Sequence, residues 1–557
     1  MAEIYNEYLT MDFDDKGCPK NLKFNIKDNF NFAYDVVDEL AKRSPDKRAL
    51  IYQDVKGNVK EFSFSDISRM SNKAANILSQ NGVKKGDRVM LMMKRRYQYW
   101  FITIALHKLG AITIPTSHMV TEKDVADRVE CAGINTIIGV ADPYVLDTLN
   151  KTKPLVGDKV KMYTADKAVS GFDYFFENVD SVSDKFDRVE NSIKDIMLLY
   201  FTSGTSGKPK GVEHDFSYPL AHIVTAKFWH GCKDGGVHFA IADSGWAKSA
   251  WGKLYGQWFC ECAVVVYDFE NFIGHETLAL LENFKVTSFC APPTIYKYLV
   301  REKLEDYDLS NLEELVTAGE KMPEAIAQNF EKRTGKHIRE GFGQTETVLQ
   351  LASYTWCPDI KDGLGVASPI YNIDVVDELG NPVPNGEEGE LVIRPWIDGQ
   401  IPIGIFTAYF NDAELYKYVW RQGMYHTNDK VVRDINGVFH YIARADDVIK
   451  SSGYRIGPAE VEEVLMKEPS VLECAVTGYP SKNRGQVVKA TIVLKPELKY
   501  TDIKNVEKEI KKFVQDRVAA YKMPRMIEFV ESLPKSTSGK ISRELIRRMD
   551  LKKLNSI

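Results

Sequence analysis

The sequence predicts an α/β protein with a large N-terminal domain on parallel sheets, a β-rich subdomain, and a small α+β C-terminal domain. Predicted helices alternate with short apolar strands until about residue 380, and strands joined by Gly, Asn and Pro turns take over at 373–394. The chain has 557 residues, too many for one hydrophobic core. The polar stretch 443–447 separates two self-contained patterns, so we expect domains at 1–445 and 446–557.

The segment from residue 65 to 115 illustrates the α/β pattern. Ser65 is placed to cap a helix that ends before Gly82, because apolar residues recur between them at helical spacing. The segments 87–92 and 111–115 are apolar strands, and 99–110 between them predicts a second helix. This helix–strand stretch is the most apolar of the chain, but His, Lys and Gly interrupt it, so we expect it to be buried rather than to span a membrane.

Composition excludes several classes of protein. The net charge of −5 and the pI near 6.1 give no basic surface for nucleic acid. The first ten residues lack the basic start and apolar core of a signal peptide. Eight cysteines are scattered without a C-x-x-C pair, so structural zinc is not expected and reduced thiols are. These features predict a cytoplasmic protein without a transmembrane segment.

The stretch "LLYFTSGTSGKPKGVEH" at 198–214 is the strongest local signal. It follows the apolar strand 196–201, and parallel strands of α/β proteins bind ligands at their carboxyl ends. Its glycines permit close backbone approach to an anion, while hydroxyls and two lysines supply donors and charge. A flexible linker is the alternative. A Walker P-loop is excluded because Pro209 follows Lys208 and no glycine lies five residues before Gly207.

Four further motifs occur in order: "EGFGQTET" (340–347), "YHTNDKVVRDINGVFHYIARADD" (425–447), "IKSSGYRIGPAEVEEVL" (449–465) and "PKSTSGKISR" (534–543). With the first loop they resemble the adenylate-forming superfamily of acyl-CoA synthetases, luciferases and peptide-synthetase adenylation domains. The medium-chain branch related to acetyl-CoA synthetase is the most similar. The resemblance implies an acid–thiol ligase that uses ATP, Mg²⁺ and coenzyme A. Such an enzyme converts a carboxylic acid to acyl-AMP with release of pyrophosphate, and then transfers the acyl group to CoA.

The same resemblance assigns roles to individual residues. Lys540, Glu346 and Thr202 are the expected catalytic residues, and Glu346 is the expected Mg²⁺ ligand. The sequence departs from the family at Asn428, where glycine is usual, and at Ala443; asparagine tolerates left-handed backbone, so we expect the turn to survive. The expected ATP-binding residues are Thr202, Ser203, Gly204, Thr205, Ser206, Gly207, Lys208, Pro209, Lys210, Glu340, Gly341, Phe342, Gly343, Gln344, Thr345, Asp429, Arg444 and Lys540.

Lys540 is implied to bridge the carboxylate and the α-phosphate as a point charge. It lies far in sequence from the phosphate loop, so the small domain is expected to close over the large one and then to swing for the CoA step, with Asp446 as the hinge. One further family CoA position carries Gln515 instead of the usual lysine. The expected CoA-binding residues are Ser452, Gly453, Tyr454, Arg455 and Arg484.

The acyl pocket is predicted from Gly343. Acetyl-CoA synthetases place tryptophan there, so hydrogen in its place leaves room for several methylenes, each contributing about 0.8 kcal/mol when buried. We therefore expect a medium-chain, branched or aromatic acid rather than acetate. Trp246 resembles a wall of the acyl pocket, and we expect Trp251 near it; core packing is the alternative for both.

Other functions share part of this pattern. An amino-acid adenylation module needs an aspartate for the substrate ammonium, where this chain has Trp246-Ala247-Lys248-Ser249-Ala250-Trp251. An acyl-AMP ligase or a luciferase-like enzyme would use the same ATP motifs. A non-catalytic nucleotide-binding regulator is disfavoured by Lys540, Glu346 and Asp429 together. The expected partners are the acid, ATP and CoA, with a homodimer as the assembly to test.

Overall fold

The computed structural model describes residues 3–203, 209–396, 399, 401–451, 454–481, 484–496, 503–515, 517–536 and 540–555. The chain divides into two compact units. The first comprises Met1–Asn372 and Arg394–Trp420, and the second comprises Ile373–Ile393 and Arg421–Ile557. The second unit therefore combines the hairpin-rich segments with the C-terminal segment. The predicted domain boundary between residues 445 and 446 stays a prediction.

The first sheet of the large unit has eight strands in the order β21-β11-β10-β6-β5-β7-β8-β9. Its strands from β10 to β9 are parallel, while β11 and β21 add antiparallel strands at one edge. The bounds are β5 (Arg88–Met92), β6 (Ile112–Pro115), β7 (Thr136–Gly139), β8 (Lys161–Thr164), β9 (Asp173–Tyr174), β10 (Ile196–Ser203), β11 (Pro209–Asp215) and β21 (Ala408–Phe410). The strands predicted at 87–92, 111–115 and 196–201 are thereby confirmed.

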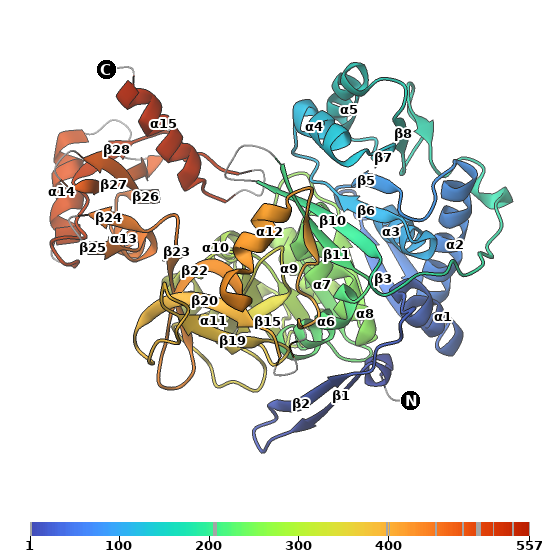
Figure 1. Ribbon diagram of the computed structural model, residues 1–557, viewed down its shortest axis with the longest axis horizontal. Helices are drawn as coiled ribbons and strands as arrows, with labels where there is room; N and C mark the ends of the chain where they lie inside the picture. Colours follow the sequence, from blue (N-terminus) through green and yellow to red (C-terminus); the bar gives the residue numbers. More distant parts are fainter. Residues whose placement is uncertain are drawn as a thin grey trace. The chain divides into compact units, whose positions relative to one another are not determined.

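The second sheet has nine strands in the order β18-β17-β16-β15-β14-β12-β13-β3-β4. Its six central strands are parallel, and antiparallel strands close both edges. The bounds are β3 (Arg48–Gln53), β4 (Val59–Ser63), β12 (Val237–Ala240), β13 (Ala263–Tyr267), β14 (Ser288–Cys290), β15 (Glu314–Ala318), β16 (Ile338–Gly343), β17 (Leu349–Ala352) and β18 (Val366–Ala367). A separate hairpin of β1 (Leu9–Phe13) and β2 (Pro19–Phe24) precedes both sheets (Figure 1).

Helices join these strands in the pattern that the sequence predicts, and α2 and α3 pack side by side (Figure 1). The N-cap of α2 corrects one expectation: it is Ser63, not Ser65. Ser63 accepts the Asp66 N–H while the Asp66 carboxylate accepts the Ser63 N–H, so two otherwise unpaired donors are satisfied. The bounds are α1 (Glu39–Arg43), α2 (Phe64–Gln80), α3 (Gln98–Leu109), α4 (Glu122–Ala132), α5 (Pro143–Val156), α6 (Tyr218–Val224), α7 (Ala247–Lys253), α8 (Tyr255–Phe259), α9 (Gly274–Asn283), α10 (Pro293–Leu299), α11 (Glu324–Thr334) and α12 (Ala413–Val419).

The second unit holds a four-stranded sheet, β19-β20-β22-β23, and a five-stranded sheet in which β25, β24, β27 and β26 follow one another and β28 pairs with β27. Helices α13 and α14 pack on a core of aliphatic side chains that includes Ile456, Val476 and Ile510. The bounds are β19 (Asn372–Val376), β20 (Glu388–Arg394), β22 (Tyr425–Arg433), β23 (Phe439–Arg444), β24 (Ile449–Ser451), β25 (Tyr454–Ile456), α13 (Pro458–Met466), β26 (Val471–Ser481), β27 (Gly485–Leu494), α14 (Ile503–Gln515), β28 (Met526–Phe529) and α15 (Arg543–Asn555).

Candidate active site

The predicted phosphate loop joins two paired strands. Thr202 of β10 pairs with Lys210 of β11, and the Thr202 hydroxyl donates to the Lys210 carbonyl at 3.4 Å. The predicted contacts Gly204, Thr205, Ser206, Gly207 and Lys208 lie outside the described residues, as do the side chains of Ser203 and Pro209. Because β10 runs parallel to β6, the loop begins at the carboxyl end of a parallel strand, where α/β folds bind ligands.

Lys210 and Glu346 form a buried ion pair beside this loop. The Lys210 ammonium lies 2.7 Å from Oε1 of Glu346, and the Tyr409 hydroxyl donates to the same oxygen at 2.9 Å. Burial of Glu346 opposes its negative charge, but Lys210 and Tyr409 outweigh it and hold the pKa of this carboxyl below its usual value. Glu346 is therefore ionised at neutral pH. No sequence motif predicts Tyr409, which reaches the site through the pairing of β21 with β11.

The segment Glu340–Thr345 starts on β16 and continues past its end. Thr317 and Ala318 of β15 pair in register with Glu340 and Gly341, so the turn after β15 reaches the same sheet edge. This turn was not predicted, although an apolar strand followed by Ala-Gly-Glu (318–320) is a signal for it. Burial raises the pKa of the Glu340 carboxyl to about 7, against a hydrogen bond of 3.3 Å from the Met322 N–H. Glu340 therefore titrates near neutral pH.

His214 fixes the backbone of the Gln-Thr-Glu segment. Its Nε2 lies 2.8 Å from the Thr345 carbonyl oxygen, and the centroid of its ring lies 4.0 Å from the ring centroid of Tyr218. Burial lowers the pKa of His214 to about 4, so the imidazole is neutral and donates its Nε2–H to the carbonyl. This hydrogen bond fixes the backbone that leads into Glu346.

The space beside Gly343 is bounded by Trp251. A Cβ added to Gly343 would lie 2.4 Å from Cη2 of Trp251 and 2.6 Å from the Val348 carbonyl oxygen. The absent side chain at this position therefore leaves less room than we expected, since the buried indole from α7 fills the adjacent volume. Trp246 is half-buried and occupies the N-cap position of α7. The fold brings Trp251 to Gly343, and the acyl-pocket roles of Trp246 and Gly343 stay predictions.

The predicted ribose-binding residues lie on paired strands of the second unit. Asp429 on β22 stands opposite Arg444 on β23, and their side chains approach to 3.9 Å. Asp429 is buried and accepts from the Tyr441 hydroxyl at 3.4 Å. Asn428 has φ of +62°, so asparagine here takes the left-handed conformation that it tolerates better than most residues.

Lys540 lies in the second unit, just before α15, and is exposed. Its carbonyl accepts the Ser536 N–H at 2.7 Å, which closes the turn that carries it. Among the predicted CoA residues, Ser452 and Gly453 and the side chain of Arg455 lie outside the described part of the chain, and Arg484 is exposed. Tyr454 is exposed and stacks on Tyr521, with ring centroids 4.2 Å apart.

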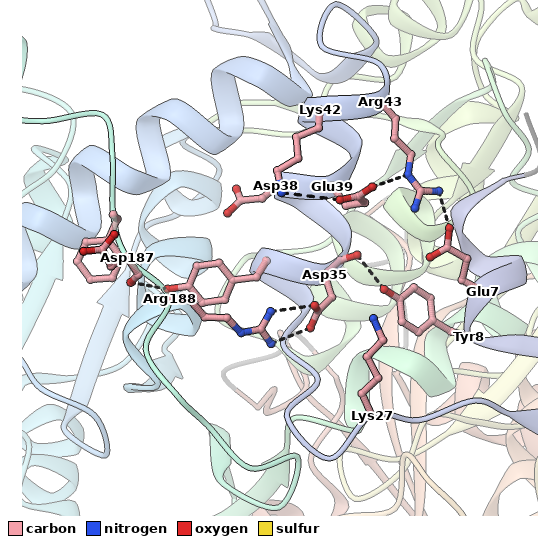
Figure 2. Close-up of a pocket in the computed structure, with 12 residues that line it drawn as sticks. Glu7, Tyr8, Lys27, Asp35, Asp38, Glu39, Lys42, Arg43, Asp187 and Arg188 are labelled. Atoms are coloured by element: carbon pink, nitrogen blue, oxygen red, sulfur yellow. Dashed lines mark hydrogen bonds and ion pairs between the residues drawn. The ribbon is translucent and has the colours of Figure 1, made fainter.

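A polar hollow of about 550 Å³ lies elsewhere on the large unit, lined by the short helix 33–38, α1 and the segment 186–188 (Figure 2). Two ion pairs join residues of its lining: Arg188 lies 2.9 Å from Asp35, and Arg43 lies 2.7 Å from Glu39. None of the predicted site residues lines it. This hollow is therefore separate from the predicted site.

Comparisons with known proteins agree with this geometry. The chain matches the AMP-binding enzyme family over residues 37–396 and the AMP-binding enzyme C-terminal domain over residues 460–540. It is 34% identical to the mitochondrial acyl-coenzyme A synthetase ACSM3 of Rattus norvegicus, over 98% of this chain and 96% of the relative. The crystal structure of the anthranilate CoA ligase AuaEII with anthranoyl-AMP is similar with a TM-score of 0.84 and 25% identity, covering 96% of this chain and 99% of that one. An acyl-CoA synthetase from Brucella canis has a TM-score of 0.71 and 27% identity, covering 94% and 95%.

The chain belongs to the AMP-binding enzyme family. It is an AMP-forming acid–CoA ligase, which uses ATP with Mg²⁺ and takes CoA as the acyl acceptor. The site fits the metal, because the ionised carboxylate of Glu346 is the hard oxygen ligand that Mg²⁺ prefers. In the described part of the chain, no helix has both the length and the apolar character needed to cross a membrane.

Proposed function

We propose that this ligase activates a branched, aromatic or medium-chain carboxylic acid in preference to acetate. The observation that carries the proposal is the contact between Gly343 and Trp251: a Cβ on Gly343 would lie 2.4 Å from the indole, so the Trp251 ring, rather than a side chain at 343, lines this part of the site. The indole bounds this space, so compact branched or planar acids fit better than long straight chains. The similarity to an anthranilate CoA ligase supports an aromatic acid as one member of the set.

The first half-reaction joins the carboxylate to the α-phosphate. Both groups are negative, so the chain must supply cations and N–H donors along the line of attack. We assign the β- and γ-phosphates to Thr202–Lys210, the adenine and α-phosphate to Glu340–Thr345, and the ribose to Asp429 and Arg444. Bound Mg²⁺ would be held by Glu346 and would neutralise charge on the departing pyrophosphate.

Lys210 is poised for this step because its ammonium already lies at the Glu346 carboxylate. A phosphate oxygen can take the place of the carboxylate as the partner of Lys210, provided that bound Mg²⁺ would balance the charge of Glu346. Lys540 supplies the remaining cation, at the carboxylate and α-phosphate oxygens. No covalent enzyme nucleophile is required.

The second half-reaction uses the segment after residue 446 in another orientation. We assign Asp446 as the hinge, with a mobile domain from 446 to 557 that brings Ser452, Gly453, Tyr454, Arg455 and Arg484 to CoA. The turn at the hinge is short: the Asp447 and Val448 N–H groups both donate to the Arg444 carbonyl, at 3.0 and 3.1 Å. A single φ/ψ change next to this turn can redirect everything after it.

A panel of acids tests the proposed specificity. AMP release is measured with CoA and carboxylates from C2 to C10, with branched and aromatic acids included. We expect kcat/KM for the best branched or aromatic acid to exceed that for acetate by at least about 10²-fold, since three or more buried methylenes contribute roughly 0.8 kcal/mol each. Equal efficiency with acetate would overturn the proposal.

Cytoplasmic location and homodimer formation are also proposals. All eight cysteines are free thiols, five of them buried, as expected in a reducing compartment. Fractionation of cells that express the full chain tests the location. Light scattering of the purified protein tests the assembly.

A further inference from the structure

The residue that follows the proposed hinge is held by two arginines of α15. Oδ1 of Asp447 lies 2.5 Å from Nη1 of Arg547, and Oδ2 lies 3.6 Å from Nη1 of Arg543. The Asp447 side chain is only 14% exposed, so this is a half-enclosed pair of contacts rather than a solvated surface contact. The chain is therefore fixed to α15 one residue after Asp446.

Arg543 is anchored on its other side as well. Its Nε and Nη2 contact the two carboxylate oxygens of Glu462 at 3.1 and 2.5 Å, a bidentate pair. Glu462 belongs to α13 and also accepts the Val476 N–H of β26 at 2.7 Å. Burial opposes the charge of Arg543, but its carboxylate partners prevail and raise its pKa. These contacts join α13, β26 and α15 around one guanidinium.

The same helix adjoins the turn of Lys540. Arg543, the first residue of α15, comes three residues after Lys540, and the Ser542 N–H donates to the Pro534 carbonyl at 2.9 Å to close the base of the turn. The two functional ends of the C-terminal segment, its first residues after the hinge and the lysine near its end, are thus attached to one short stretch of helix.

We propose that Asp447, Arg543 and Arg547 form a coupling clamp that transmits rotation at Asp446 to Lys540. This rests on the proposed roles of Asp446 and Lys540. With the clamp intact, motion is confined to the backbone before Asp447, and the lysine moves as part of a rigid body. Without the clamp, the backbone after Asp446 moves independently of α15 and Lys540 is misplaced. A misplacement of about 1 Å can lower the rate by about 10²-fold. The three are positioning residues.

Arg547→Ala and Asp447→Asn test the clamp, with Arg548→Ala as the matched control. Arg548 is the next residue of the same helix, but it pairs with Glu544 within α15 at 2.6 Å. Pyrophosphate exchange measures adenylation. We expect kcat for exchange to fall at least about tenfold in both clamp variants, with little change in KM for ATP because no clamp residue is assigned a contact with ATP. Arg548→Ala should behave as the wild type.

A conservative substitution separates coupling from simple stability. Arg547→Lys keeps a cation opposite Asp447 and leaves Arg543 with its carboxylate partners, so pyrophosphate exchange should be at least about threefold faster than in Arg547→Ala, while circular dichroism shows both variants folded. Wild-type rates of pyrophosphate exchange in Arg547→Ala and Asp447→Asn, or equal rates in Arg547→Lys and Arg547→Ala, would overturn the clamp. Lys540→Ala is measured in parallel. If Lys540→Ala leaves exchange intact, the proposed role of the lysine fails; if it abolishes exchange while the clamp variants do not, the clamp alone fails.

Discussion

The two units hold their charged groups in different ways. In the large unit, the carboxylate of Glu346 is buried and already paired with the Lys210 ammonium at 2.7 Å. In the second unit, the side chains of Arg444 and Asp446 are each 42% exposed, and Lys540 is exposed. A preorganised site needs its charges in place before the ligand arrives. A group that serves one half-reaction and then withdraws gains more from accessibility, and its action depends on where its domain is placed.

The largest expected effect follows from the loss of Lys540. This variant tests the role of the exposed charged groups in the second unit. Lys540→Ala should lower the rate of acyl-adenylate formation by roughly 10²-fold or more, because one transition-state charge contact is removed. Thioester formation from preformed acyl-AMP and CoA should stay near the wild-type rate. Pyrophosphate exchange and single-turnover thioester assays measure the two steps separately. Equal loss in both steps would contradict a role confined to adenylation.

A proline at the proposed hinge tests whether the action of Lys540 and of the CoA residues depends on the orientation of the segment after residue 446. Asp446→Pro should keep adenylation and lower thioester formation at least about tenfold, since proline fixes φ near −65° and holds one orientation. The hydrogen bonds described for this turn are donated by Asp447 and Val448, so the substitution spares them. Asp446→Ala is the control and should have a modest effect. Normal overall turnover in the proline variant would remove Asp446 as the pivot.

Variants of the proposed acyl pocket test the preorganised site of the large unit. Gly343→Trp alone should misfold or lose activity, because its Cβ would already meet the Trp251 ring. Trp251→Leu should not rescue Gly343→Trp, because the Val348 carbonyl oxygen also lies 2.6 Å from that Cβ. Trp251→Leu by itself removes the indole and should raise the ratio of kcat/KM for longer acids over the preferred acid by roughly tenfold. The ATP dependence of exchange serves as the control, and an unchanged ratio in a folded Trp251→Leu variant would place the pocket elsewhere.

Sequence predicted the α/β pattern and the order of the motifs because both are local. The left-handed Asn428 followed from residue chemistry, and the helix at 64–80 followed from periodicity. Its N-cap was wrong by two residues, since the deciding feature is the reciprocal pair that Ser63 makes with Asp66. Tyr409 could not be found, because strand pairing brings it to a glutamate 63 residues away in sequence.

The contact between Trp251 and Gly343 was missed for the same reason. It depends on how α7 packs against β16, and neither periodicity nor motif spacing specifies that packing. Sequence therefore identified the residue whose side chain is absent, but not the residue that fills the space beside it.

The smallest expected effect concerns the carboxyl of Glu340. It measures how much the enclosure of a carboxylate in the large unit lowers the free energy of unfolding. Its pKa is about 7 in the folded protein, raised by burial from an ordinary value of 4.5. A raised folded pKa gives stability that is fully present below pH 4.5 and is lost as pH rises through 7. The free energy of unfolding of the wild type should therefore fall between pH 5 and 8 relative to Glu340→Gln, by on the order of 1 to 2 kcal/mol. Thermal unfolding at pH 5, 6, 7 and 8 measures this difference, and Glu324→Gln, at an exposed glutamate on α11, controls for the loss of one carboxylate. If the gap between Glu340→Gln and the wild type is constant across this range, Glu340 is ionised throughout, and enclosure of this strand end does not disfavour its charge.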